Sequence, residues 1–370
     1  MLETFLCARL RLAARNMSLN RADEQLVTKR VEVRMGFHDA NFSVLWYNTP
    51  CMDDAKTTIL VCGARSGAHL LEIAGREPDA KISAHVYDCH QARKIRQDLT
   101  AAGKADSFEV ILAPYLPDGR MWDKGAFFKD DKSMSAELQL DCMQNLLAHV
   151  KGGENAKVAG IDKPTRRKVL SRKRNFAAEW PASVPGGEKL VFTSLPGCFC
   201  HRRADEGGLA LAEVAARELA VSRRECKTTR ILDMGCGAGF VGILVAKAIP
   251  SACLTLLDSH TRAVAAARIN AERHDVQADF ILSDIGTPQE LNESFDVFLG
   301  NPPYYGNWLI ADMFLATAQR ALKPGGVCYT VAKSPRGLGE IQREFFGTVK
   351  TIPRRGYAVL KSVMRAEPQS

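Results

Sequence analysis

Short apolar runs alternate with helical patterns along this chain, and the same order of elements occurs twice. In each half, an apolar run enters a glycine turn, a helical pattern follows, a second apolar run ends in an acid, and a later helix stops at paired glycines. Strands that alternate with helices are typical of α/β folds with a parallel sheet. The matching landmarks lie 172, 170 and 173 residues apart: Gly67 and Gly239, Asp88 and Asp258, Gly152 and Gly325.

Three landmarks in register predict two tandem Rossmann-like α/β domains. We expect a flexible extension at residues 1–25, a first domain at 26–178 and a second domain at 179–370. Prolines and glycines that cluster between Glu179 and Gly187 mark the expected boundary. The sequence leaves open whether residues 1–16 belong to the native protein, since Met17 is an alternative start.

The two copies differ in their polar residues, and the first is expected to be degenerate. Four positions of the second copy hold different residues in the first. The second copy has Asp233, Gly237, Ala238 and Asn301, and the first has Val61, Arg65, Ser66 and Lys129 at the matching positions. We therefore expect only the second domain to carry a complete site.

Composition narrows the class of protein. The net charge of +8 and the pI near 8.9 favour a polyanionic partner. No apolar stretch approaches the roughly 18 residues of a membrane span, so no membrane partner is expected. Eleven cysteines, an odd number without regular spacing, argue against a secreted disulfide framework and predict a cytoplasmic protein. Cys198-x-Cys200-His201 has no second ligand pair at finger-like spacing, so no metal is expected.

The second glycine turn, Asp233-x-Gly235-x-Gly237-x-Gly239, indicates a nucleotide-type cofactor site. Glycines let the backbone approach a ligand, and they expose amides at the start of the next helix. The turn departs from the dinucleotide fingerprint because residue 240 is Phe240 instead of glycine. Asp258, at the end of the next strand, is placed to accept bonds from both ribose hydroxyls. Ser283-Asp284 ends the following apolar run, where a carboxylate or backbone amide can receive an adenine amino group.

Asn301-Pro302-Pro303-Tyr304 follows an apolar run at 295–299, and α/β sheets bind ligands at the carboxyl ends of their strands. An amine conjugated to a base or amide is a poor nucleophile because its lone pair is delocalised. The Asn301 side-chain oxygen and the Pro302 carbonyl could hold both of its N–H groups and turn the lone pair towards an electrophile. The prolines stiffen the loop, and Tyr304 offers a face on which a planar group can stack.

The glycine turn, Asp258, Asp284 and Asn301-Pro302-Pro303-Tyr304 follow one another along the chain. In this order, they resemble the motifs of the class I S-adenosylmethionine-dependent methyltransferases that methylate amines. The tandem domains resemble the bacterial ribosomal RNA guanine-N2-methyltransferases of the methyltransferase small-domain family, whose first domain is a degenerate copy. The resemblance implies that S-adenosyl-L-methionine is the cofactor and that the first domain serves RNA or substrate recognition. The implied cofactor-binding residues are Asp233, Gly235, Cys236, Gly237, Gly239, Asp258, Ser283, Asp284 and Asn301.

The segment from Phe199 to Gly207 is similar to the Phe-Ser-x-x-x-Leu-Asp-x-Gly stretch of that family. The similarity implies that Asp205 lies near the cofactor or the target base, although the sequence allows a helix N-cap equally well. Two departures leave the target nucleotide open. Cys200 replaces the usual serine, and Tyr304 runs on into Tyr305-Gly306-Asn307-Trp308, where the family tends to have Phe and His.

A basic run at 163–174 contains no acid and favours phosphate contact over a merely solvated face. The pairs Arg202-Arg203 and Arg354-Arg355 support this interpretation. The expected substrate-binding residues are Asp205, Tyr304, Lys163, Arg166, Arg167, Arg172 and Arg174.

We therefore predict an N-methyltransferase that acts on the exocyclic amine of a ribosomal RNA base, with guanine N2 preferred. Its catalytic residues would be Asn301, Pro302, Pro303 and Tyr304, and its partner ribosomal RNA, a ribosomal subunit or an assembly intermediate. The alternatives are a protein glutamine N5-methyltransferase of the release-factor type, a non-catalytic RNA-binding assembly factor and, less favoured, a DNA adenine methyltransferase. The sequence does not identify the nucleotide or the oligomeric state.

Overall fold

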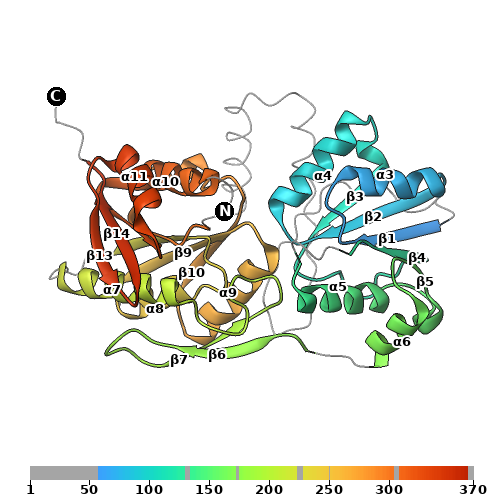
Figure 1. Ribbon diagram of the computed structural model, residues 1–370, viewed down its shortest axis with the longest axis horizontal. Helices are drawn as coiled ribbons and strands as arrows, with labels where there is room; N and C mark the ends of the chain where they lie inside the picture. The colour runs from blue at the N-terminus through green and yellow to red at the C-terminus, as the bar shows by residue number, and fades with distance from the viewer. Residues whose placement is uncertain are drawn as a thin grey trace, which may run out of the picture. The chain divides into compact units, whose positions relative to one another are not determined.

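The computed structural model describes residues 57–129, 134–171, 175–222, 228–249, 251–303 and 308–365. The chain divides into two compact units: unit 1 ends at Arg174, and unit 2 begins at Asn175 (Figure 1). The expected extension at residues 1–25 lies outside the described residues.

The described residues of unit 1 form a five-stranded parallel sheet in the order β3-β2-β1-β4-β5. Helices α3 and α4 cover one face of this sheet, and α5 covers the other (Figure 1). The elements of unit 1 are β1 Thr57–Cys62, α3 Gly67–Arg76, β2 Ala80–Val86, α4 Cys89–Ala101, β3 Phe108–Leu112, β4 Lys124–Phe127, α5 Ala136–Ala148, β5 Lys157–Ala159 and α6 Lys163–Ser171.

The described residues of unit 2 form a seven-stranded sheet in the order β10-β9-β8-β11-β12-β14-β13 and a separate hairpin of β6 and β7. Helices α7, α8 and α9 cover one face of the sheet, and α10 and α11 cover the other (Figure 1). Strand β14 pairs antiparallel with both β12 and β13. The elements of unit 2 are β6 Ala178–Ala182, β7 Leu190–Ser194, α7 Glu206–Ser222, β8 Thr229–Met234, α8 Phe240–Lys247, β9 Ala252–Asp258, α9 Thr261–Arg273, β10 Ala278–Leu282, β11 Phe295–Gly300, α10 Leu309–Ala321, β12 Leu322–Ala332, α11 Pro335–Phe346, β13 Lys350–Arg354 and β14 Tyr357–Val363.

The first five strands of the unit 2 sheet repeat the strand order of unit 1. The first residues of β1 and β8, of β2 and β9, and of α4 and α9 are each 172 positions apart. The two tandem Rossmann-like domains are therefore confirmed.

One of the predicted landmark pairs is wrong. At a constant offset of 172, the partner of Asp258 is Val86, which ends β2. Asp88 lies beyond the strand and caps α4, where its side chain accepts a hydrogen bond from the Gln91 N–H at 3.1 Å. Its counterpart is His260, which caps α9 in the same way. The acid predicted at the strand end of the first domain is therefore a helix cap.

The cluster of prolines and glycines at 179–187 is part of a hairpin. Pro181 lies in β6, and Gly186 and Gly187 lie in the turn before β7. The division between the units falls earlier, after Arg174, because hairpin turns and linkers share the same residue types. In the part of the chain that the structure describes, no helix is both long enough and apolar enough to cross a membrane.

Candidate functional site

The glycine turn joins β8 to α8, and Gly235, Gly237 and Gly239 all adopt positive φ, at +69°, +54° and +80°. A Cβ at Gly235 would lie 2.7 Å from the Phe314 ring, and one at Gly239 would lie 3.0 Å from the Ala267 side chain. A Cβ at Gly237 would meet nothing within 4 Å. The first and last glycines therefore permit close packing, whereas Gly237 faces open space that a ligand can fill.

Asp233, in β8 just before the turn, is buried beneath it and bonds to the backbone of α8. Its side chain is only 3% exposed, and its Oδ2 accepts a hydrogen bond from the Gly242 N–H in α8 at 2.9 Å. Burial raises the pKa of Asp233 to about 7, the bond from Gly242 opposes the shift, and the charge of Asp258 adds to it. The structure therefore places Asp233 beneath the turn, where it can act on a cofactor through the backbone.

Asp258 lies beside the turn at the end of β9. Its Oδ2 accepts from the Gly237 N–H and its Oδ1 from the His260 N–H, both at 2.9 Å. These bonds fix the carboxylate beside the glycine turn. The Ser283 N–H donates to the Asp258 carbonyl at 3.0 Å, which joins the ends of β9 and β10.

The other predicted cofactor residues lie on the same edge of the sheet and contribute in different ways. The Ser283 hydroxyl donates to the Gly286 carbonyl at 2.8 Å, so it shapes the turn in which half-buried Asp284 lies. Cys236 is buried, and burial raises the pKa of its thiol well above the usual range. Its N–H donates to the Leu257 carbonyl at 3.0 Å, so Cys236 serves the turn structurally.

Asn301 follows β11 and contacts a residue 96 positions earlier in the chain. Its Nδ2 donates to the Asp205 Oδ2 at 2.8 Å. The same carboxylate oxygen accepts from the Gly208 N–H at 2.7 Å and so caps α7. With Nδ2 donating to Asp205, the amide oxygen of Asn301 is the acceptor of this side chain. Of the rest of the motif, Pro302 is buried, Pro303 is half-buried, and Tyr304 lies outside the described residues.

The cysteine that departs from the family pattern also contacts Asp205. The Cys200 thiol lies 3.7 Å from the Asp205 Oδ1 and donates to it. Burial and the negative charge of Asp205 raise the pKa of Cys200, which keeps the thiol protonated as a donor. Cys200 therefore donates to Asp205 from the position of the usual serine, but as a weaker donor than a hydroxyl. His201, two residues before Arg203, contacts the Ser194 hydroxyl at 2.9 Å.

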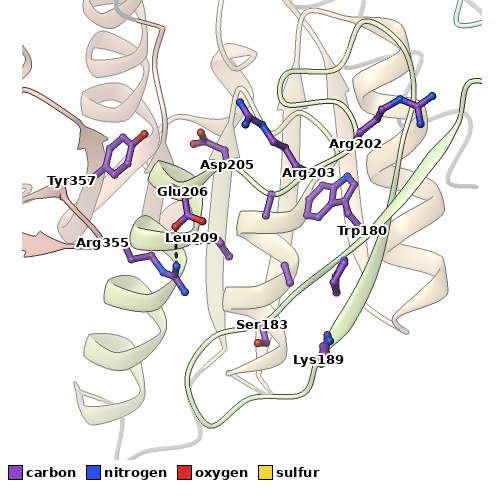
Figure 2. Close-up of a pocket in the computed structure, with 13 residues that line it drawn as sticks. Trp180, Ser183, Lys189, Arg202, Arg203, Asp205, Glu206, Leu209, Arg355 and Tyr357 are labelled. Atoms are coloured by element: carbon purple, nitrogen blue, oxygen red, sulfur yellow. Dashed lines mark hydrogen bonds and ion pairs between the residues drawn. The ribbon is translucent and has the colours of Figure 1, made fainter. Parts of the chain in front are cut away.

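A pocket of about 760 Å³ opens next to Asp205 (Figure 2). Its walls come from the β6–β7 hairpin, the loop at 202–205, the start of α7 and the turn between β13 and β14. Because Asp205 lines this pocket and also bonds to Asn301, the pocket adjoins the predicted catalytic loop. The sequence alone did not predict the hairpin wall.

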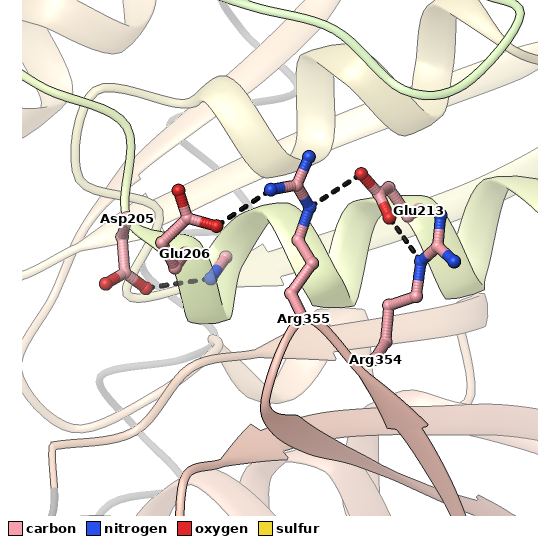
Figure 3. Close-up of polar contacts among 6 residues, drawn as sticks. Asp205, Glu206, Glu213, Arg354 and Arg355 are labelled. Carbon is pink, nitrogen blue, oxygen red and sulfur yellow. Dashed lines mark hydrogen bonds and ion pairs between the residues drawn. The ribbon is translucent and has the colours of Figure 1, made fainter.

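Arg354 and Arg355 are held by carboxylates of α7, as Figure 3 shows. The buried Glu213 accepts from the Nε of both arginines, at 2.7 Å for Arg355. Arg355 also donates to Glu206 at 2.8 Å. These bonds, led by the one to Glu213, raise the pKa of Arg355. The arginine pair predicted to contact phosphate therefore fixes one wall of the pocket.

Asn270 is a structural residue that the sequence analysis missed. It is fully buried in α9, where its Oδ1 accepts from the Thr193 N–H at 2.7 Å. Its Nδ2 donates to the carbonyls of Thr193 and Ala238, each at 2.8 Å. Asn270 thus joins the hairpin to the glycine turn. An asparagine among the alanines of an amphipathic helix was the available signal.

The basic run lies in unit 1, and part of it is structural. Arg166 donates to the carbonyls of Ile161 at 2.5 Å and Val158 at 3.4 Å, and Arg167 pairs with Glu154 at 3.3 Å. Lys163 begins α6 and is exposed. Arg172 and Arg174 lie outside the described residues.

In unit 1, the chain packs closely around Gly63, the counterpart of Gly235 at an offset of 172. The His69 and Phe128 rings stack with centroids 4.3 Å apart, and a Cβ at Gly63 would lie 2.2 Å from the Phe128 carbonyl oxygen. Val61, the counterpart of Asp233, is fully buried. The carboxylate that the second copy has beneath its glycine turn is therefore replaced in the first by an apolar side chain.

The family model that matches this chain covers a part of unit 2. A family model described as methyltransferase small domain matches residues 189–361. Ribosomal RNA small subunit methyltransferase C of Haemophilus influenzae (strain PittGG) is 28% identical over 181 residues, which are 48% of this chain and 52% of the relative. Ribosomal RNA large subunit methyltransferase G of Shewanella amazonensis is 30% identical over 182 residues, which are 47% of this chain and 45% of the relative. The chain spans about half the length of the curated relatives it matches.

A solved structure resembles the chain over both units. It is a T. thermophilus 16S rRNA N2 G methyltransferase, RsmC, in complex with AdoMet and guanosine. The TM-score is 0.64 at 18% identity, and the match covers 83% of this chain and 88% of that chain. This similarity supports the tandem fold. The residues that the methyltransferase small-domain model matches, 189–361, contain the glycine turn, Asp205 and Asn301.

Proposed function

We propose that this chain transfers a methyl group from S-adenosyl-L-methionine to the exocyclic amine of a ribosomal RNA base, with guanine N2 preferred. The observation that carries the proposal is the hydrogen bond from Asn301 to Asp205, next to the glycine turn and at the carboxyl end of β11. The names of the relatives, and the AdoMet and guanosine bound to the similar RsmC structure, support the choice of cofactor and substrate.

The residues around the glycine turn fit this cofactor. Gly237 leaves open the space that a side chain would fill, and Asp258 is fixed beside it, where its carboxylate would accept from the ribose hydroxyls. Asp284, two residues after β10, would receive the adenine amino group. When bound, the cofactor supplies an electrophilic methyl group on a sulfonium.

Asn301 and Pro302 orient the amine in this proposal. The Asn301 amide oxygen and the Pro302 carbonyl each accept one N–H, which directs the nitrogen lone pair towards the methyl carbon. As the new nitrogen–carbon bond forms, the sulfur–carbon bond breaks and the nitrogen becomes more acidic, so water can take its proton. Tyr304 would stack on a base that has left its helix, as expected of enzymes that act on base amines.

The proposed partner is ribosomal RNA, free or within a ribosomal subunit or assembly intermediate. Unit 1, which has Val61 where unit 2 has Asp233, would serve RNA recognition through Lys163 and its neighbours. We place the reaction in the cytoplasm, because all eight cysteines in the described ranges are free thiols.

Methyl transfer from labelled S-adenosylmethionine tests the proposal directly. The full chain and its Asn301→Ala variant are offered deproteinised ribosomal RNA and, separately, a peptide-chain release factor. We expect label in RNA that is lost in the variant, while calorimetry shows cofactor binding by both proteins. Label in the release factor alone would favour the glutamine reaction. Cofactor binding without any transfer to RNA or to ribosomal subunits would overturn the proposal.

A further inference from the structure

We propose that the pocket beside Asp205 binds a backbone phosphate of the RNA next to the target nucleotide, and that Lys189 and Arg203 are its main contacts. This inference rests on the proposed function, since it assumes that the target amine lies at Asn301. Three features support it: the position of the pocket, the excess of positive charge on its walls, and the backbone that presents the arginines.

The position follows from Asp205. This residue bonds to Asn301 and lines the pocket, so the two places share one side chain. A flipped base at Asn301 remains attached to its sugar and phosphates, which must leave the site through an adjoining space. The pocket of about 760 Å³ is large enough to hold a sugar-phosphate group.

The charges favour an anion. The walls carry four cations and two carboxylates: Lys189, Arg202, Arg203 and Arg355, with Asp205 and Glu206. Glu206 is paired with Arg355, and Asp205 already accepts from Asn301 and Gly208. Within the described ranges, neither Lys189 nor Arg203 forms an ion pair with a carboxylate, and the Arg203 side chain bonds to the Cys200 thiol. The exposed cations of the pocket therefore outnumber the acids that could neutralise them.

The backbone that presents the arginines is strained. Cys200 and Arg202 adopt positive φ, at +49° and +78°, although neither is a glycine. The conformation is held by two bonds: the Arg202 N–H donates to the Ser194 hydroxyl at 3.1 Å, and the Arg203 N–H donates to the Cys200 carbonyl at 3.2 Å. Non-glycine residues in this region cost about 1 kcal/mol or more each. Such strain is typical of functional loops.

The two proposed contacts come from separate segments. Lys189 precedes β7 in the hairpin, and Arg203 lies in the loop before α7. In Figure 2, the Arg203 side chain reaches towards Asp205, and Lys189 lies on the opposite, lower wall. The guanidinium presents several donors in a fork that matches phosphate oxygens, and the ammonium adds a point charge. The two cations thus face one space from two sides.

The experiment measures binding of a single-stranded RNA oligonucleotide by fluorescence anisotropy at several KCl concentrations, together with methyl transfer to deproteinised ribosomal RNA. The test variant is the full chain with Lys189→Ala and Arg203→Ala. The control has Lys247→Ala and Arg336→Ala, which remove the same charge from exposed positions of unit 2 outside the pocket. A second variant, Lys189→Arg with Arg203→Lys, keeps both charges.

We expect the test variant to bind RNA about three- to thirtyfold more weakly, with KM raised and kcat little changed. Its slope of log K against log salt should be smaller by about 0.7 for each lost phosphate contact. The control should keep the wild-type slope, and the charge-conserving variant should recover most of the affinity.

A test variant that matches the control in slope and KM would overturn the inference, provided that the wild type methylates RNA. A wild type that does not methylate RNA would instead refute the proposed function.

Discussion

Asp205 is predicted to position Asn301, and its variants separate that role from helix capping. One oxygen of Asp205 accepts from both Asn301 and Gly208. Alanine at this position removes both bonds. Loss of an N-cap costs about 1 kcal/mol of stability. Loss of a hydrogen bond to a charged group costs about 1.5–3 kcal/mol, which corresponds to a fall in kcat of roughly 10- to 150-fold if it is felt in the transition state.

Serine and asparagine at position 205 provide the matched controls. Asp205→Ser retains an N-cap acceptor but is too short to reach Asn301, so its stability should stay near that of the wild type while kcat falls as in Asp205→Ala. Asp205→Asn keeps a carbonyl oxygen in the same place. Its thermal stability should therefore stay close to that of the wild type, and its kcat should fall only a few-fold. None of the three should change the affinity for the cofactor by more than a few-fold.

The assays are single-turnover methyl transfer, calorimetry with the cofactor and thermal unfolding. A double-mutant cycle with Asn301→Ala should show that Asp205→Ala has almost no further effect on kcat once Asn301 is gone. Full activity of Asp205→Ser, or additive losses in the cycle, would refute the reasoning.

Further predictions concern the cofactor side of the site. Because the pKa of folded Asp233 is raised to about 7, the folded state binds its proton more tightly than the unfolded chain, whose value is near 3.8, and stability should fall as pH rises from about 4 towards 7. Asp233→Asn should flatten this dependence, as judged by urea midpoints between pH 5 and 8; parallel curves for both proteins would contradict it. Asp258→Ala leaves the N–H groups of Gly237 and His260 without their acceptor, so calorimetry should show cofactor affinity lowered by tenfold or more. Gly237→Val adds bulk on the open side at positive φ, so it should reduce cofactor binding much more than it reduces the melting temperature; an equal loss in both would contradict a ligand on that side.

The repeated order of elements could be predicted from sequence because it rests on local patterns. Apolar runs, glycine turns and helix stops recur at a nearly constant offset, and the strands of both sheets follow that offset. The pairing of Asp88 with Asp258 failed because an acid after a strand can end that strand or cap the next helix. The pairing of β2 with β1 and β3 stops before Asp88, which shows that this acid caps the helix and does not end the strand.

The site was less predictable because its contacts join distant segments. The resemblance implied that Asp205 lies near the reacting groups, but the bond to Asn301 spans 96 residues and depends on how α7 begins beside β11. Likewise, the sequence suggested that Arg354 and Arg355 bind phosphate. No pattern near them in the sequence indicates that Glu213 of α7 accepts hydrogen bonds from both. Asn270 carries no motif, yet it joins the hairpin to the glycine turn.

Mass spectrometry of nucleosides tests the central claim most directly. Ribosomal RNA is incubated with the full chain and S-adenosylmethionine, digested to nucleosides and compared with RNA treated with Asn301→Ala. The account predicts N2-methylguanosine that forms with the wild type and is absent with the variant. Methylation confined to adenine N6, or to a glutamine of a release factor with no methylated nucleoside, would contradict it.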